Sequence, residues 1–290
     1  MTEIECLKPP PATRYNYLSL GAGVQSSCLA LMLEHKEIET QVDGAVFADT
    51  QSEPAEVYEW LDELEKLVSF PIHRVTAGDL RKESLRVRKS KRTGINYLNV
   101  KIPFFVTKDV GRDSIMGRKC TGSFKIEPIT QALRKLCNVK RGQKETTVTQ
   151  MIGISWDEIQ RMKELRRTPW AQARWPLLEK RMTRRDCKEW MKANGYPEPP
   201  RSACTFCPFH NDGEWRRLKT EHAKDFAEAV TFEKELQAAN LKADPKGQVR
   251  GVPYLHSSCK PLEEVDLSTD QERGQIVWDF GSECEGVCGV

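Results

Sequence analysis

The chain has 290 residues, of which 39% are hydrophobic and 30% are charged, and its formal net charge at pH 7 is +3. This length suits one large α/β domain, or a core domain with a smaller appendage. The sequence has no apolar run of about 18 residues that would predict a membrane span, and Met1 to Cys6 lack the basic start and apolar stretch of a signal peptide. We therefore expect a cytoplasmic protein, and the mild net charge does not by itself indicate nucleic-acid binding.

The first strongly patterned segment combines a strand, a small-residue turn and a helix. Apolar residues predict a strand from Tyr15 to Leu20, and Cys28 to Leu33 predict the start of a helix. Free backbone N–H groups and the positive end of the helix dipole meet at such a turn, where Gly lets a phosphate approach closely. The segment from Gly21 to Ser27 is neither a Walker A loop nor the G-x-G-x-x-G dinucleotide motif. The sequence leaves two interpretations, an anion site or an ordinary tight turn.

Strands and helices alternate along the following part of the chain. The apolar patterns predict strands over 42–48, 71–75, 147–154 and 173–178, and helices over 54–68, 126–136 and 183–193. Thr183 is the predicted N-cap of the last helix, with Asp186 at its third position. We also expect a hairpin within Asn96 to Val106. Strands separated by helices of this length predict a parallel sheet with right-handed crossovers.

Arg81 to Arg92 is strongly basic, with seven Lys or Arg residues. One interpretation is a solvated, mobile helix and loop. The other is an arm or lid that contacts a polyanion.

The composition changes after Pro197, which predicts an α/β domain over 1–196 and a second region over 197–290. The second region begins with prolines and Cys204-Thr205-Phe206-Cys207. It then has a polar helical stretch over 213–240, a short strand over 250–255 and a tail containing Cys284 and Cys288.

Ten cysteines in a chain without an export signal argue against a disulfide scaffold. Cys28, Cys137 and Cys187 fall in predicted helices, and we expect them to be buried thiols.

The spacing Cys204-x-x-Cys207 can chelate a metal ion or the iron of a cluster. Cys120 is the leading third ligand, because Arg118 and Lys119 favour its thiolate form. His210, His256 and Cys259 are candidates for a fourth ligand. From spacing alone an iron–sulfur cluster, structural zinc and a redox dithiol all remain open. Cys284 and Cys288 lie in the C-terminal tail. We interpret this tail either as a mobile segment whose thiol moves into and out of a site, or as an ordinary frayed chain end.

Several ordered segments together resemble the PAPS reductase family of the adenine nucleotide alpha-hydrolase-like (PP-loop) superfamily. The resemblance runs from about Tyr15 to Phe209, through the loop from Ser19 to Ser27, Val46 to Thr50, Lys125-x-x-Pro128, Met151 to Ile154 and the helix after Thr183. It implies a doubly wound, mainly parallel α/β sheet flanked by helices, of the HUP-like PP-loop type. A small cysteine-containing helical region would follow this fold.

The resemblance also implies roles for individual residues. The nucleotide would be bound by the loop and the end of the second strand, and Lys125 would clamp its phosphate or sulfate. Cys120, Cys204 and Cys207 would hold a 4Fe–4S cluster, with zinc as the alternative, and Cys284 or Cys288 would be the nucleophile. The implied nucleotide-binding residues are Ser19, Gly21, Ala22, Gly23, Gln25, Ser26, Asp49 and Thr50.

The implied activity is cysteine-dependent sulfur chemistry on PAPS, APS or ATP, with Mg as a possible companion of the nucleotide and a thiol reductant such as thioredoxin as partner. The chain departs from the family where Ile154 to Glu158 replaces paired arginines, and where Thr121 replaces a second adjacent cysteine. Three cluster cysteines are similar to the set in tRNA-thiolating PP-loop enzymes. ATP-dependent thiolation of tRNA or DNA, gripped by Arg81 to Arg92, is therefore the alternative. A non-catalytic nucleotide- or zinc-binding protein is the third.

Overall fold

The computed structural model describes residues 8–106, 114–115, 117–165, 168–249, 251–269 and 272. The predicted tail cysteines, Cys284 and Cys288, lie outside these residues. No helix in the described ranges is both long and apolar enough to cross a membrane.

A five-stranded parallel sheet forms the centre of the α/β part, in the order β3-β2-β1-β8-β9. Its strands are β1 (Tyr15–Leu20), β2 (Gly44–Asp49), β3 (Ile72–Thr76), β8 (Val148–Ile152) and β9 (Ala171–Arg174). All four neighbouring pairs are parallel. The predicted α/β class with a parallel sheet is therefore confirmed.

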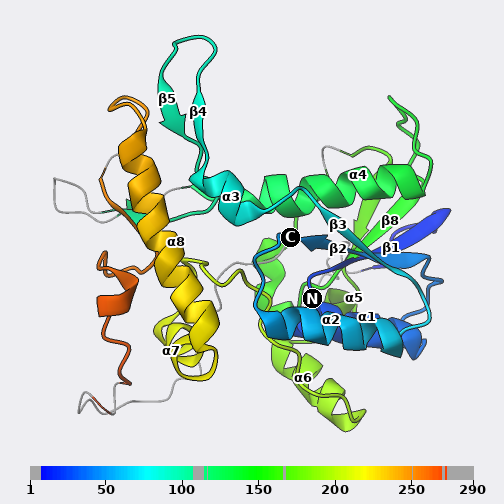
Figure 1. Ribbon diagram of the computed structural model, residues 1–290. Coiled ribbons are helices and arrows are strands. Elements are labelled where there is room, and N and C mark those ends of the chain that lie inside the picture. The colour runs from blue at the N-terminus through cyan, green and yellow to red at the C-terminus, as the bar shows by residue number, and fades with distance from the viewer. Residues whose placement is uncertain are drawn as a thin grey trace.

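Helices cover both faces of this sheet, as Figure 1 shows. Leu18 and Leu20 of β1 pack into a core with α1 (Val24–Glu34), α2 (Ala55–Leu67) and α6 (Arg184–Ala193). Tyr17, on the opposite face of the strand, packs with Ile129 and Leu133 of α4 (Glu127–Leu136). The alternation along β1 follows from the period of two along a strand, so each face of the sheet has its own apolar set.

A second apolar core lies outside the sheet. It contains Trp215 and Leu218 of α7 (Asp212–Glu221), Phe232 and Leu236 of α8 (Ala223–Lys242), and apolar side chains between Leu80 and Val106. The polar helical stretch predicted over 213–240 forms these two helices, separated at His222. The prediction of a domain boundary at residue 196 stays a prediction.

The segment between β3 and α4 differs most from expectation. It contains α3 (Leu80–Leu85), β4 (Val87–Lys89), β5 (Asn96–Leu98), β6 (Phe105–Val106), β7 (Ser114–Ile115) and a π-helical turn over Thr121–Ile126. The predicted hairpin within Asn96 to Val106 is wrong, because β5 pairs with β4 and β6 pairs with β7 and with β10 (Pro253–Tyr254). Half of the basic segment is therefore a strand and a turn rather than a helix and loop.

One other prediction changes in the second half of the sheet. The strand predicted over 173–178 ends at Arg174, and Pro176 begins a short helix, α5 (Pro176–Glu179), because Pro fits a first helical turn. Helix α6 begins as predicted, with reciprocal bonds between Thr183 and Asp186. Two short 3₁₀ helices complete the fold, one over Trp156–Arg161, kinked at Glu158, and another over Leu262–Glu264.

The isolated cysteines are buried as expected. Cys28 and Cys187 are fully buried, and Cys137 at the end of α4 is nearly so. Burial raises the pKa of the Cys137 thiol to about 12, so this thiol stays protonated and acts as a small apolar group.

Candidate functional site

The strand order places a ligand site at the ends of β1 and β8. β1 and β8 are neighbours, while the chain proceeds outward from them to β2 and β3 on one side and to β9 on the other. In an open parallel sheet, the crevice at such a reversal of strand order lies at the carboxyl ends of the strands and accepts ligands. A pocket is found there, lined by Ser19 and Leu20 of β1, by Ile152 at the end of β8 and by Gly153 after it.

The loop between β1 and α1 has a fixed shape. The Ser26 hydroxyl accepts a hydrogen bond from the Gly21 N–H at 3.1 Å and donates one to the Gly23 carbonyl at 3.2 Å. Ala22 is fully buried with a φ of 59°, a left-handed conformation that costs energy for a residue with a Cβ. Packing and the Ser26 hydroxyl hold this turn, which leaves the first N–H groups of α1 directed at the pocket.

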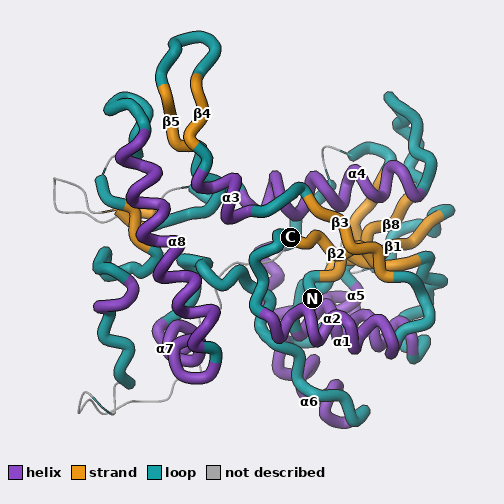
Figure 2. Tube along the Cα trace, in the orientation of Figure 1, coloured by secondary structure: helices purple, strands orange, loops and turns teal. Residues whose placement is uncertain are grey.

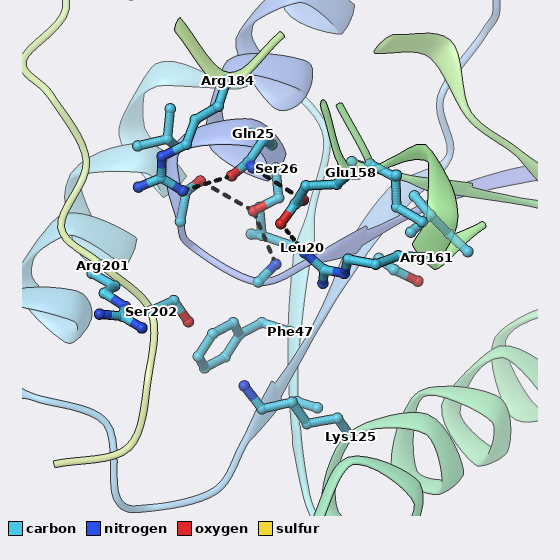
Figure 3. A pocket seen from close by; sticks show the side chains of 18 of the residues that line it. Leu20, Gln25, Ser26, Phe47, Lys125, Glu158, Arg161, Arg184, Arg201 and Ser202 are labelled. Atoms are coloured by element: carbon cyan, nitrogen blue, oxygen red, sulfur yellow. Dashed lines mark hydrogen bonds and ion pairs between the residues drawn. The ribbon is translucent and has the colours of Figure 1, made fainter. Parts of the chain in front are cut away.

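Four cationic side chains and one carboxylate line this pocket. Lys125, Arg161, Arg184 and Arg201 come from four different segments, and Glu158 is the carboxylate. Figure 3 shows them distributed around the buried ring of Phe47, with Arg201 beside Ser202 on one side and Arg161 on the other. The surplus of positive charge, next to a helix N-terminus, favours an anionic ligand.

Gln25 connects two of these charges. Its Nε2 donates to Glu158 Oε2 at 3.2 Å, and its Oε1 accepts from Arg184 Nη1 at 3.2 Å. Glu158 in turn forms an ion pair with Arg161. The Gln25 amide therefore binds Glu158 through its nitrogen and Arg184 through its oxygen. A carboxylate at position 25 has no N–H donor and could not bind Glu158 in this way.

Lys125 stands between two cavities. Its Nζ lies 3.3 Å from Oε1 of Glu53, a fully buried side chain, and the Ser202 hydroxyl lies 3.4 Å from Oε2 of the same carboxylate. Lys125 lines the pocket at the loop and also a smaller cavity next to it. The π-helical turn over Thr121–Ile126 positions this lysine, and such turns are frequent at functional sites.

The smaller cavity gathers the predicted ligand cysteines. Cys120, Cys204 and Cys207 all line it, together with Thr50 and Lys125. Thr50 Oγ1 lies 3.4 Å from the Cys204 sulfur, and the Thr205 N–H donates to the Ser52 carbonyl at 2.9 Å. The loop that follows β2 therefore holds the Cys-x-x-Cys loop in place.

His210 supports the same loop from behind. Its Nε2 lies 2.9 Å from the Cys204 carbonyl oxygen, to which the neutral ring donates. Burial, and after it the charge of Arg201, lower the pKa of His210 to about 4, so the ring is neutral at pH 7. Its Nδ1 is buried and has no hydrogen-bond partner within the part of the chain that the structure describes.

The donor chemistry of the cavity suits a cluster or zinc, because both prefer cysteine thiolates. Within the described ranges, however, no group of three or more His, Cys, Asp or Glu side chains is arranged to hold a metal ion. Of the predicted fourth ligands, His256 already contacts Asp212 at 3.1 Å and Ser258 at 2.8 Å through its two ring nitrogens, and Cys259 is buried. A metal or cluster at Cys120, Cys204 and Cys207 therefore remains a proposal.

The predicted nucleotide-binding residues divide into two groups. The pocket is lined by Ser19, Gly21, Gly23, Gln25 and Ser26, whereas Ala22, Asp49 and Thr50 are not among its lining residues.

Asp49 instead accepts hydrogen bonds from the Tyr58 hydroxyl at 2.8 Å and from the Gln51 N–H at 2.7 Å. Thr50 lies at the cysteine cavity. The carboxylate of Asp49 thus orders the turn after β2, one strand away from the loop.

Sequence reasoning missed Arg184, Arg201 and Ser202 as pocket residues. Arg184 is the first residue of α6. The capping box of Thr183 and Asp186, which marks the start of this helix, was the sequence feature that could have indicated it. Arg201 and Ser202 precede the Cys-x-x-Cys loop. The proline-rich sequence there does not indicate that the chain comes back to the pocket at the end of β1.

Comparisons with known proteins give little further guidance. No protein-family model matches the chain, and no curated protein sequence matches it. Among solved structures, the chain is similar to phosphoadenylyl-sulfate (PAPS) reductase from Candida auris in its phosphate complex. The identity is 13%, the match covers 64% of this chain and 75% of that chain, and the TM-score is 0.39. A likeness at this level assigns no activity, so the function has to be argued from the residues of the site.

Proposed function

We propose that this protein is an enzyme that binds an adenine nucleotide at the β1–α1 loop and performs cysteine-dependent sulfur chemistry beside it. The observation that carries the proposal is the shared wall of the two cavities. Lys125 lines both the cationic pocket and the cavity of Cys120, Cys204 and Cys207. An anion held in the first cavity therefore lies next to the thiols of the second.

The cationic residues would divide the work of binding. The N–H groups at the start of α1 would hold a phosphate or sulfate, and Arg184 and Arg201 would add charge-assisted hydrogen bonds. Lys125 would act as a compact point charge that moves between Glu53 and the bound anion. PAPS, APS and ATP all carry the anionic groups that this pocket suits.

With PAPS or APS, the sulfur step would be a nucleophilic displacement. A thiolate of Cys284 or Cys288 would attack the sulfonyl sulfur, and the bond to the phosphate oxygen would break with its electron pair leaving on the nucleotide. A second thiol, from a reductant protein such as thioredoxin, would then attack the cysteine sulfur of the resulting thiosulfonate. This step releases sulfite and forms a disulfide, which accounts for the two electrons.

Cys120, Cys204 and Cys207 would hold a 4Fe–4S cluster, with zinc as the alternative occupant. When bound, such a cluster supplies an iron site for sulfur ligation or electron transfer. The residues of this chain would hold the cavity closed and dry around it, through the contacts of Thr50 and His210 with the Cys-x-x-Cys loop.

ATP-dependent thiolation of tRNA or DNA is a second candidate, and one observation favours it. The basic β4–β5 hairpin projects from the molecule, as Figure 2 shows. Shortly after β5, Ile102 and Pro103 line the cysteine cavity. A protein that binds ATP and not PAPS would support this candidate. A protein that binds nucleotide or zinc without turnover would support a non-catalytic role.

Nucleotide binding is tested by calorimetric titration of ATP, APS and PAPS, with and without Mg²⁺, on anaerobically purified protein. We expect Arg184→Ala to weaken binding about 10- to 100-fold, the loss of one or two charge-assisted hydrogen bonds. Arg185→Ala is the matched control, because Arg185 is the next residue on α6 and its side chain is 82% exposed. Equal affinities in the two variants, or no binding of any of the three nucleotides, would contradict the proposal.

The cluster is tested by iron, zinc and acid-labile sulfide analysis of the same protein. We expect iron and sulfide to fall together in Cys120→Ser and in Cys204→Ser, while Cys137→Ala retains the wild-type content, since Cys137 lies in a separate core. A colourless, iron-free wild-type protein that still turns over its nucleotide would refute the cluster.

A further inference from the structure

The hairpin of β4 and β5 projects from the part of the chain that the structure describes. Its two strands pair antiparallel, with Val87 opposite Leu98 and Lys89 opposite Asn96. Figure 2 shows the hairpin extending away from α3 and α8 into solvent, with its tip farthest from the sheet. The hairpin takes no part in either cavity.

The turn at the tip is closed by its own backbone. The Gly94 N–H donates to the Ser90 carbonyl at 2.9 Å, and the Thr93 N–H donates to the Ser90 hydroxyl at 3.2 Å. Gly94 has a φ of 71°, which Gly adopts without strain. This turn exposes Lys91 and Arg92 at the corner of the hairpin, and Lys89 lies just below them.

Positive charge on this segment is not balanced by the segment itself. From Arg86 to Val106 there are six Lys or Arg residues and no Asp or Glu. The carboxylates that face the hairpin are few. Glu83 forms ion pairs with both Arg86 and Arg88, and Asp244 accepts a hydrogen bond from the Asn96 N–H. Lys89, Lys91 and Arg92 have no ion pair within the described residues, so their charges are available to a partner.

The base of the hairpin is fixed to the rest of the chain. Asn96 and Asp244 exchange two hydrogen bonds, of 2.6 and 3.0 Å, and the Leu98 N–H donates to the Gly247 carbonyl at 3.2 Å. Gly247 packs so closely that a Cβ there would lie 2.0 Å from the Asn96 carbonyl oxygen. The charges are therefore presented on a supported element, and binding to it orders little additional chain.

Two further features extend the surface toward the cysteine cavity. Tyr97, the cross-strand partner of Arg88, exposes about a third of its surface on the hairpin. Beyond β5, the Lys101 carbonyl accepts a hydrogen bond from the backbone N–H of Lys119 at 3.0 Å, and Lys119 immediately precedes Cys120. The next residues, Ile102 and Pro103, line the cysteine cavity itself.

We propose that the β4–β5 hairpin is a docking surface for the phosphate backbone of a nucleic acid. Spaced lysines and an arginine on a projecting element suit repeated phosphates, and the exposed ring of Tyr97 can stack on a base. An acidic polypeptide would use the same cations but carries no bases to stack on the ring. The inference does not depend on the nucleotide pocket, and the two are measured separately.

The test is fluorescence anisotropy with labelled single-stranded and duplex DNA and RNA of mixed sequence, titrated with full-length protein at several salt concentrations. The variant is the triple substitution Lys89→Ala, Lys91→Ala and Arg92→Ala. The matched control is Lys66→Ala, Lys180→Ala and Lys192→Ala, which removes the same charge from exposed lysines of the α/β part.

We expect the wild type and the control to bind, with affinity falling steeply as salt rises, and the hairpin variant to bind more weakly with a shallower slope. Between 50 and 200 mM salt, the affinity of the wild type should fall about 20- to 40-fold more than that of the hairpin variant, because the variant has lost three phosphate contacts. The single variant Lys91→Glu should weaken binding in the same direction, which guards against misfolding of the triple variant.

Equal salt dependence in the hairpin variant and the control would overturn the inference, and so would wild-type protein that binds no nucleic acid. Displacement of the nucleic acid by polyglutamate at equal charge concentration would also overturn it in favour of an acidic protein partner. Nucleotide affinity of the hairpin variant, measured by calorimetry, should match the wild type, which separates this outcome from failure of the proposed function.

Discussion

At the scale of single residues, the shape of the cationic pocket depends on how closely β8 approaches the β1–α1 loop. A Cβ at Gly153 would lie 3.0 Å from the Ser26 Cα and 3.1 Å from its backbone nitrogen. These are backbone atoms of the first turn of α1, which cannot rotate away. Gly153 therefore sets the distance between the end of β8 and the N–H groups at the start of α1.

We expect Gly153→Ala to destabilise the protein by about 1–3 kcal/mol and to weaken nucleotide binding, because the added methyl group pushes the loop from β8. Gly122→Ala is the control, since nothing lies within 4 Å of a Cβ at that position. Thermal unfolding and nucleotide titration of both variants check the prediction. Unchanged affinity in Gly153→Ala would show that the loop position does not matter for binding.

At the scale of elements, an arginine joins the helices of the two cores. Arg217 of α7 donates to both oxygens of Glu56 on α2, at 3.1 and 2.6 Å, and also to Glu214 at 2.9 Å. The hydrogen bonds with Glu56, and then with Glu214, raise the pKa of Arg217. Both partners of the α2–α7 pair are about three-quarters buried, so water screens this pair less than a surface pair.

We predict that Arg217→Lys lowers the free energy of unfolding by about 1–2 kcal/mol, because lysine keeps the charge but cannot bind both oxygens of Glu56 in a fork. Arg185→Lys should change it by less than about 0.5 kcal/mol, since its ion pair with Glu189 is largely exposed. Urea unfolding of the two variants measures the difference. Equal stabilities would mean that the α2–α7 contact rests on apolar packing.

The hairpin shows what element-scale reasoning from sequence could not reach. The residues near Asn96 have strand character, and β5 does form there, but its partner is β4 rather than the chain that follows. The choice of partner is fixed by Asp244 and Gly247, about 150 residues away. A local pattern has no access to such a contact, so it predicted a strand correctly and its pairing wrongly.

At the scale of the whole molecule, the sequence predicted the parallel sheet because each strand and helix is encoded locally by its own periodicity. It also identified Lys125, Cys120 and Cys204, which the structure brings to one cavity. It did not identify Arg184 and Arg201 as pocket residues, because both reach the loop only after the chain has crossed the sheet. Charges that converge from distant segments leave no spacing signal.

The interleaving of the two cores has a consequence for how the chain folds. Leu98, Ile102 and Phe104 share a core in which most of the other residues lie after residue 200, while β1 finds its partner β8 more than 120 residues later. Early during synthesis, β1 to β3 can pair, but the segment that follows them must wait with its apolar side chains uncovered. The anion pocket is completed only when Arg201 and Ser202 return to β1. The capacity to bind a ligand therefore arises late, and a chain cut after residue 196 would lack two pocket residues and leave the apolar segment after β5 open to aggregation.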